Sequence, residues 1–393
     1  MAQRIIYWFR NDLRLNDNDA LLAAVNSSEE IVPVYVFDPR QFENTKLKFR
    51  RTGALRAKFL IESVAELRNR LRQKGGELLI RIGEPEKIVA QIAEDYSAQY
   101  VYTSKEIGPE ETRIESSLSK NLKIFNVDIK LFWMDTLVHA MDLPFPISKL
   151  PASYNDFDPQ IRKNLTVKEV SAEPLKITLP SEYEAGAIPS LPALGIDPIE
   201  ISKSDQTNLH PAGGESAALS ALTDYLGQLN NAYSESEPLT DSRLSDWLSL
   251  GCLSARFIYH EALKSRNGEF QNLIDDLLKR DYFQWILLRY GPRIFKLSGV
   301  KHDFSTQWAK DQTVFDSWAH GETTDIELNK CMKMLKANGF ITARERQFAA
   351  DYLVNNLRTN WTWGAMFFES CLLDYEVSVN WGKWNNIAGV GHD

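Results

Sequence analysis

The sequence predicts a protein of two folded parts, an α/β domain with a doubly wound, five-stranded parallel sheet and an all-helical domain that follows it. The chain of 393 residues is long enough for two hydrophobic cores. Short β-branched runs alternate with helical patterns at the start, prolines gather in the middle, and helical periodicity fills the remainder. These changes predict an α/β domain over residues 1–135, a linker over 136–214 and a helical domain over 215–393.

Strands are expected at five apolar runs: RIIYWF (4–9), IVPVYVF (31–37), ELLIRI (77–82), QYVYTS (99–104) and DIKLFWM (128–134). The clearest intervening helix covers residues 53–76, where Leu60, Val64, Leu67 and Leu71 recur at helical spacing before two glycines. Strands that alternate with helices form a parallel, Rossmann-like sheet. The turn after the first strand has no G-x-G-x-x-G, which argues against an ordinary dehydrogenase domain.

The middle segment is expected to be mostly extended. Ten of the sixteen prolines lie between residues 136 and 214, and proline restricts both its own backbone and that of the preceding residue. Connections of this length are usually functional or wrap another surface.

Composition narrows the class of protein. Three widely spaced cysteines indicate a reducing cytoplasm, and no apolar run is long enough to cross a membrane. The six histidines show no metal-ligand spacing, so no metal site is expected. The net charge of −8 argues against a generally basic nucleic-acid-binding protein. A local group of cations could be a solvated face or a track for phosphates: Arg289, Arg293, Lys296, Lys301, Lys330, Lys333 and Lys336.

Several polar residues lie at the start of an apolar helical pattern in the predicted helical domain. Thr240, Asp241, Ser242 and Ser245 precede or begin this pattern. They could simply cap a helix, or they could hold a pyrophosphate with their hydroxyls and free backbone N–H groups.

Charged and aromatic residues in the later helices suggest a second site. Arg346 and Asp374 could pair beside a polar heterocycle, although spacing alone favours an interhelical salt bridge. Asp276 and Arg280 share a helical face, as do Asn380 and Trp384. Eight of the ten tryptophans lie from Trp247 onward. Such rings more often fill cores, but a row of them could carry a hole from an excited cofactor to the surface.

Several motifs together resemble the photolyase/cryptochrome family, specifically its cryptochrome DASH branch. They include YWFRNDLRLNDNDAL and VFDPRQF near the start, and LSDWLSLGCLSARFIY, RDYF, DYEVSVNWGKWN and AGVG in the helical domain. The resemblance covers nearly the whole chain. It implies an N-terminal antenna domain, typically with a folate, and a helical domain that binds FAD without a covalent bond.

The resemblance also assigns roles to individual positions. It implies that the FAD phosphates meet Ser242, Leu244 and Ser245, with Tyr233 beside them. The remaining cofactor-binding candidates are Asp276, Arg280, Arg346, Asp374, Glu376 and Asn380, and Glu110 is the candidate antenna contact. Asn380 would face the flavin N5 atom. Trp384, Trp361 and Trp308 match the proximal, middle and distal members of an electron-transfer chain.

The implied activity is light-driven repair of cyclobutane pyrimidine dimers, preferably in single-stranded DNA. The catalytic candidates are Trp384, Trp361, Trp308, Asp276 and Asn380. Such a protein would be a deoxyribodipyrimidine photo-lyase.

Departures from the family pattern keep two alternatives open. Lys279 stands where a tryptophan is usual, Ala343 replaces an asparagine, and Asn386 replaces an aromatic residue. Asp276 is shorter than the usual glutamate, and the helices that normally follow AGVG are expected to be missing. The protein could therefore be a photoreceptor without repair activity, or a remnant that does not bind flavin.

Overall fold

The computed structural model describes residues 3–202, 210–231, 242–264 and 270–392. Its five strands confirm the predicted sheet. They pair in parallel in the order β3-β2-β1-β4-β5. The strands are β1 (Arg4–Phe9), β2 (Glu30–Phe37), β3 (Leu79–Ile82), β4 (Tyr100–Ser104) and β5 (Asp128–Phe132).

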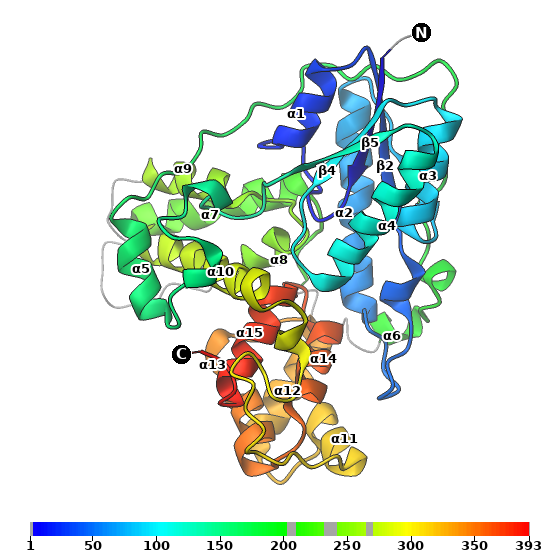
Figure 1. Cartoon of the computed structure of the whole chain (residues 1–393). Helices are drawn as coiled ribbons and strands as arrows, with labels where there is room; N and C mark the ends of the chain where they lie inside the picture. The colour runs from blue at the N-terminus through cyan, green and yellow to red at the C-terminus, as the bar shows by residue number, and fades with distance from the viewer. Residues whose placement is uncertain (1–2, 203–209, 232–241, 265–269, 393) are drawn as a thin grey trace.

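Helices cover both faces of the sheet (Figure 1). They are α1 (Asp19–Asn26), α2 (Ala54–Gln73), α3 (Pro85–Asp95) and α4 (Pro109–Ile124). Successive side chains of β1 alternate between the faces, so that Ile6 and Trp8 pack in the core under α3 and α4, whereas Ile5 and Tyr7 pack with α1 and α2. The core that contains Ile5 and Tyr7 continues without a break into the helical domain. The two domains therefore share buried apolar surface.

The middle segment is more structured than expected. Residues 154–162 form α5 (Tyr154–Arg162), in which Phe157 and Ile161 are buried. Ser153 caps the helix by accepting a hydrogen bond from the Asp156 N–H. Shorter turns of helix lie on either side of α5: η2 (Ala140–Asp142) and η3 (Ile147–Lys149) precede it, and η4 (Pro192–Leu194) and α6 (Ile199–Ser202) follow it. The expectation of a mostly extended segment was wrong there because the apolar pair can pack on the helical domain.

The remainder of this segment wraps the α/β domain. The N–H of Ile31 donates to Thr178 O at 2.9 Å, and that of Ile80 donates to Ala185 O at 2.7 Å. The second bond lies on β3, an edge strand of the sheet. This part of the segment therefore supports the interpretation of a connection that covers another surface.

The helical domain places its polar residues at helix ends and packed faces. Its helices are α7 (Glu215–Asn231), α8 (Ser245–Leu248), α9 (Ala255–Leu263), α10 (Phe270–Tyr290), α11 (Gln312–His320), α12 (Ile326–Asn338), α13 (Ala343–Asp351), α14 (Trp361–Cys371) and α15 (Val377–Ile387). Two single turns are η5 (Gly291–Phe295) and η6 (Tyr352–Asn356). None of the helices in the described part of the chain is long and apolar enough to cross a membrane.

The single apolar helix expected from residue 245 onward is divided into α8 and α9. Gly251 lies between them with φ of +63°, a conformation that glycine adopts at little cost. A Cβ atom at this position would lie 1.9 Å from Asn11 O in the α/β domain. The turn thus lets the helical domain approach the loop after β1.

Candidate functional site

A cluster of charged side chains lies where α8, α13 and the α14–α15 loop meet. Arg346 Nη1 donates to Asp374 Oδ2 at 2.9 Å, and Ser245 Oγ donates to the same oxygen at 2.9 Å. Arg346 Nε donates to Ile341 O at 2.8 Å, which fixes the guanidinium group. The helix that carries Arg346 begins with a capping box, so its first turn is well ordered. The structure therefore brings together three residues that the sequence singled out.

A second arginine–carboxylate pair, absent from the sequence prediction, lies beside the first. Arg243 Nη2 lies 2.8 Å from Asp246 Oδ2, and the Asp246 side chain is fully buried. The guanidinium carbons of Arg243 and Arg346 lie 4.4 Å and 5.4 Å from the centroid of the same Phe340 ring. The five residues Arg243, Ser245, Asp246, Arg346 and Asp374 are called the carboxylate–arginine cluster below.

Each carboxylate of the cluster keeps one buried oxygen free. Asp246 Oδ1 and Asp374 Oδ1 have no hydrogen-bond partner among the described residues. Burial raises the pKa of Asp246 to about 7, and the charge of Asp374 raises it too. Burial also acts to raise the pKa of Asp374, but Arg346 outweighs it and lowers that pKa. Buried polar atoms normally have partners, so these oxygens indicate a place for a ligand that forms hydrogen bonds with them.

The other residues expected at the phosphates are placed only in part. Leu244 is buried, and Ser242 is half-buried and accepts a hydrogen bond from the Leu244 N–H at 3.5 Å. Tyr233, Thr240 and Asp241 lie outside the described residues. Because α8 has only four residues, backbone N–H groups and hydroxyls, rather than a long helix dipole, would hold an anion here.

Asn380 and Trp384 share the buried face of α15. Asn380 Nδ2 donates to Ala365 O of α14 at 3.0 Å. The Trp384 ring lies edge-on against Phe368 and Trp318, with centroid separations of 5.2 and 6.3 Å. The contact of Trp318 with Trp384 was not predicted, because sequence spacing cannot show which rings meet.

The three tryptophans expected to form a chain differ in burial. Trp384 and Trp361 are buried, and Trp308 is partly exposed. A short parallel bridge from Ala309 to Thr359 holds the residue after Trp308 next to the start of α14. The gradient of burial is compatible with a path from the interior to the surface, and the electron-transfer role stays a prediction.

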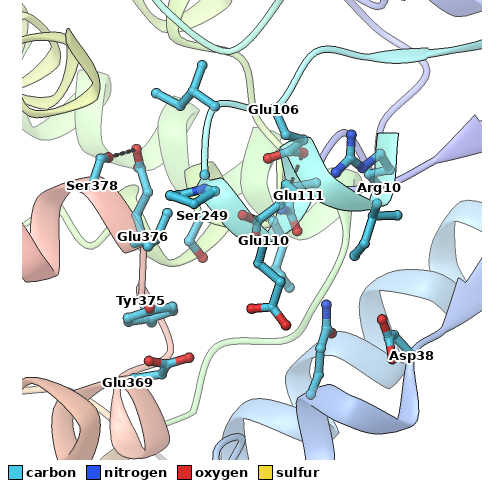
Figure 2. A pocket seen from close by; sticks show the side chains of 18 of the residues that line it. Arg10, Asp38, Glu106, Glu110, Glu111, Ser249, Glu369, Tyr375, Glu376 and Ser378 are labelled. Carbon is cyan, nitrogen blue, oxygen red and sulfur yellow. Dashed lines mark hydrogen bonds between the residues drawn. The ribbon is translucent and has the colours of Figure 1, made fainter. Parts of the chain in front are cut away.

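A cavity of about 480 Å³ lies between the two domains. Figure 2 shows Glu106, Glu110 and Glu111 of the α/β domain on one side, and Tyr375 and Glu376 of the helical domain on the other. Burial raises the pKa of Glu106 to about 7 and also raises that of Glu111. A raised carboxyl pKa in a cavity is typical of a binding site.

Arg51 joins the two walls of this cavity. It lies 2.6 Å from Glu110 Oε2 and 2.8 Å from Glu369 Oε1 of α14. Glu110, the predicted antenna contact, thus lines the cavity but is already paired. Sequence reasoning missed Arg51 and Glu106 because no local motif marks them.

Arg280 and Glu376 also belong to this cavity and not to the carboxylate–arginine cluster. Arg280 lies 2.6 Å from Glu376 Oε2 and 2.5 Å from Asp135 Oδ1. By contrast, the side chain of Asp276 is 76% exposed, and its Oδ1 lies 3.7 Å from Lys279 Nζ. Asp276 and Arg280 were expected to share one helical face, but the Asp276 side chain points to solvent and Arg280 is buried.

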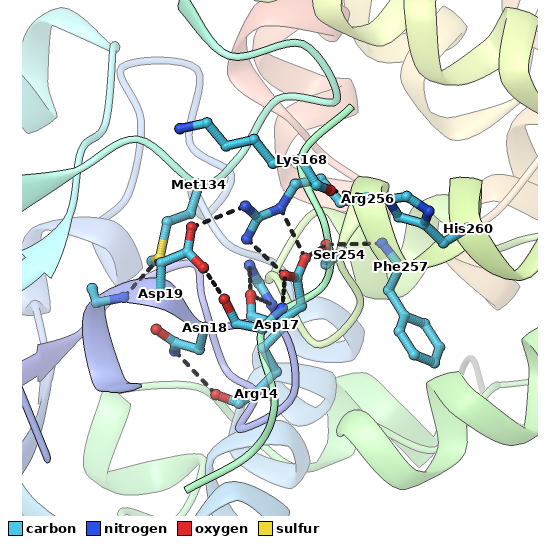
Figure 3. A network of polar contacts seen from close by, with 12 residues as sticks. Arg14, Asp17, Asn18, Asp19, Met134, Lys168, Ser254, Arg256, Phe257 and His260 are labelled. Atoms are coloured by element: carbon cyan, nitrogen blue, oxygen red, sulfur yellow. Dashed lines mark hydrogen bonds and ion pairs between the residues drawn. The ribbon is translucent and has the colours of Figure 1, made fainter. Parts of the chain in front are cut away.

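A third polar network joins the domains away from the cavity (Figure 3). Arg256 of α9 lies 2.7 Å from Asp17 Oδ1 and 2.9 Å from Asp19 Oδ2. Arg14 Nη1 donates to Gly251 O at 3.0 Å. These contacts hold the loop after β1 on the helical domain.

The carboxylate–arginine cluster fits FAD by its chemistry. FAD carries hydroxyl and N–H donors as well as an anionic diphosphate. The free oxygen of Asp374 can accept hydrogen bonds from those donors, whereas a protonated Asp246 carboxyl, Arg346 and the hydroxyls of Ser242 and Ser245 can donate to acceptors of FAD. Among the described residues, no group of three or more His, Cys, Asp or Glu side chains could hold a metal ion.

Comparisons with known proteins agree with this arrangement. The model of the DNA photolyase domain matches residues 5–176, and that of the FAD-binding domain of DNA photolyase matches residues 273–393. A cryptochrome DASH of Gloeobacter violaceus is 37% identical over 405 residues, which cover 100% of this chain and 80% of the relative. The cryptochrome DASH of Arabidopsis thaliana is 36% identical, with 99% and 70% covered.

Solved structures give the same result. A cryptochrome of Synechocystis superposes with a TM-score of 0.92 at 36% identity and covers 100% of this chain and 83% of its own. An archaeal photolyase from Sulfolobus tokodaii, solved with two FAD molecules, gives 0.81 at 25% identity, with 100% and 84% covered. The helical domain described above is thus an FAD-binding domain, and the chain belongs to the cryptochrome DASH branch of the photolyase/cryptochrome family.

Proposed function

We propose that this protein uses FAD and blue or near-ultraviolet light to split cyclobutane pyrimidine dimers, preferably in single-stranded DNA. The observation that carries the proposal is a set of charged side chains that act on Lys383, some from the buried carboxylate–arginine cluster and some from the protein surface. Lys383 belongs to α15 and is exposed. Desolvation by the surrounding protein lowers the pKa of Lys383, and the positive charges of Arg346 and Lys279 lower it further. The negative charges of Asp374 and Asp276 act to raise this pKa. The buried cluster and the exposed Asp276–Lys279 pair therefore act on one side chain.

Each of these charged groups has a definable task. FAD, when bound, would supply the light-absorbing group and the electron. Arg346, Asp374 and Ser245 would hold it through the contacts described above. The cations Lys279 and Lys383 would attract the phosphodiester backbone around the lesion. Asp276, at the solvent-facing end, would accept a hydrogen bond from a base turned out of the stack.

Single-stranded DNA suits this entrance better than a duplex. A dimer must leave the base stack to approach a buried cofactor, and unstacking costs least in a single strand. The entrance also lacks a flat ring at position 279. Lys279 Nζ instead lies 5.9 Å from the centroid of the Tyr154 ring. Since stacking contributes about 1–3 kcal/mol per base, the binding of a flipped base would rest more on charge than in a site with aromatic walls.

The direct test is repair of a defined lesion. Chemically reduced, FAD-loaded protein would be illuminated with a single-stranded oligonucleotide that contains one thymine dimer. Recovery of thymine absorbance under light, with none in the dark, is the expected result. A protein that binds FAD but restores no thymine under light would exclude the proposal.

A photoreceptor without repair is the second candidate, and one contact favours it. Lys279 is paired with Asp276, so the carboxylate proposed to hold the lesion already has a cation beside it. The Lys279→Trp/Ala343→Asn variant removes this cation and restores a ring and an amide. Gain of repair by the variant, with none in the unmodified protein, would favour the photoreceptor.

The interdomain cavity would hold the antenna, which we propose is a folate. Its volume lies in the range of small-molecule sites. Glu106, with its pKa near 7, can donate or accept a hydrogen bond to a pterin ring. Added methenyltetrahydrofolate should give a bound near-ultraviolet absorption band that Glu106→Gln weakens. Binding of a second FAD in this cavity would contradict the folate assignment.

A further inference from the structure

We propose that Asp246 is a cofactor-positioning residue that must carry a proton for FAD to bind tightly, so that FAD affinity falls as this side chain ionises. The proposal rests on FAD lying beside Arg346 and Asp374. It does not depend on whether the protein repairs DNA.

The first support is the geometry of the Asp246 carboxyl group. Its side chain is fully buried, and it occupies the second position of α8, next to Ser245 and Leu244. Arg243 binds only Oδ2, through Nε at 3.0 Å and Nη2 at 2.8 Å. The Oδ1 atom has no partner in the described ranges. A buried carboxylate with one unpaired oxygen is costly, and protonation removes most of that cost.

The second support is the unusual backbone of Arg243. Its φ is +51°, in the left-handed region that few residues other than glycine adopt. This conformation is compatible with the turn in which the Asp246 N–H donates to Arg243 O at 3.0 Å. The pairing of these two side chains thus coincides with local backbone strain, which often occurs at functional sites.

The groups around Asp246 stabilise its neutral and ionised forms to similar degrees. The charged groups that face it are Asp374 of the α14–α15 loop, Arg346 of α13 and Arg243 on its own segment. Burial and Asp374 favour the neutral acid, whereas Arg243 and Arg346 favour the anion, and the pKa is raised to about 7. Both forms are therefore populated near neutral pH.

FAD would shift this balance toward the neutral form. Its diphosphate is expected at Ser242, Leu244 and Ser245, the residues next to Asp246. A protonated carboxyl can donate its O–H to a phosphate oxygen, but an ionised one repels it. The pKa of Asp246 is then higher with FAD bound than without. FAD affinity stays constant below pH 7 and decreases as the pH rises above it, and binding takes up a proton.

The first experiment measures the dissociation constant of FAD for the FAD-stripped full-length chain at pH 6 and pH 8. One fully coupled proton predicts about tenfold weaker binding at pH 8. The Asp246→Asn variant, which keeps the neutral shape, should bind equally at both pH values. Asp281→Asn is the matched control, because burial also raises the Asp281 pKa to about 7 while the carboxylate accepts backbone N–H groups of Leu137 and Val138 elsewhere. This control should keep the dependence on pH.

The second experiment needs no variant and covers the case in which Asp246→Asn does not fold. Calorimetric titration of the unmodified chain with FAD at pH 7.5, in two buffers of different ionisation enthalpy, should show net proton uptake. Zero uptake, or release, overturns the proposal, as does an Asp246→Asn variant that keeps the tenfold change. The Arg346→Ala variant distinguishes a wrong placement of FAD from a wrong role for Asp246. If it leaves FAD affinity unchanged, the placement of FAD is wrong, and if it weakens binding while proton uptake is absent, only the role of Asp246 fails.

Discussion

Arg346 is the residue on which the carboxylate–arginine cluster depends, because it supplies the closest cation to Asp374. We expect Arg346→Ala to lower the free energy of unfolding of the FAD-free chain by about 2–4 kcal/mol, since it leaves a buried carboxylate unpaired. Urea denaturation would measure the change. In the Arg346→Ala/Asp374→Asn double variant the loss should be smaller than the sum of the single losses. A loss below about 1 kcal/mol for Arg346→Ala would show that the pair behaves like an exposed one.

Trp384 should control how fast the cofactor is photoreduced. Trp384→Phe keeps a ring in the core but removes the easily oxidised indole, so bleaching of the flavin band under blue light should slow severalfold. Trp285→Phe is the matched control. Trp285 is also buried, but its ring stacks on Trp133, with the two ring centroids 5.3 Å apart. Equal slowing in both variants would contradict the role of Trp384.

The residues of the site differed in how well the sequence predicted them. Arg346 and Asp374 were found because charged residues in apolar helices need partners. Asp246 was missed because an acidic residue in the first turn of a helix is ordinary capping chemistry. Glu106 and Arg51 were missed because the cavity forms only when segments distant in sequence meet.

Among the elements, α14 and α15 approach each other closely at Trp384. A Cβ atom on Gly364 would lie 2.3 Å from the Trp384 ring. We therefore expect Gly364→Ala to destabilise the protein by about 1–3 kcal/mol through overpacking, although alanine is the better helix former. Thermal unfolding would measure it.

The chain provides a control for this substitution in α7. A Cβ atom on Gly227 would meet nothing within 4 Å, so Gly227→Ala should stabilise the protein by about 0.5–1 kcal/mol. Opposite signs for the two variants would assign the loss at position 364 to packing. Stabilisation by both would show that α15 moves aside.

Strands were easier to predict than helix ends. Each strand of the sheet is a short apolar run with its own local signal, so all five were found. The division between α8 and α9 was not, because the turn at Gly251 depends on a close approach to Asn11, which comes from the other domain. Likewise, α5 appears where prolines suggested extended chain, since Phe157 gains burial by packing against Tyr282.

For the whole molecule, the junction at Arg256 should make stability depend on pH in the acid range. Burial acts to raise the pKa of Asp19, but hydrogen bonds from Arg256 and Ser171 outweigh it and lower the pKa. A carboxylate with a lowered pKa contributes stability above its unfolded pKa and loses it as the pH falls through the folded value. Asp19→Asn should therefore destabilise the protein at pH 7, and the difference should shrink below about pH 4.

Urea denaturation at pH 7 and pH 3 would measure this difference. Glu327→Gln is the control, because Glu327 and Lys330 form an exposed pair that should contribute little at either pH. An Asp19→Asn loss that is the same at both pH values would mean that its hydrogen bonds, and not its charge, stabilise the junction.

The two edges of the sheet bear on how the protein avoids aggregation. An unpaired edge strand can recruit strands of other molecules and begin a β-aggregate. The wrapping segment closes the β3 edge through the bond from Ile80 to Ala185, while the β5 edge carries Lys130, a residue type that discourages such pairing. Proteolytic cleavage near residue 185 would consequently threaten solubility before it disturbed the cofactor, because it would expose a strand far from the carboxylate–arginine cluster.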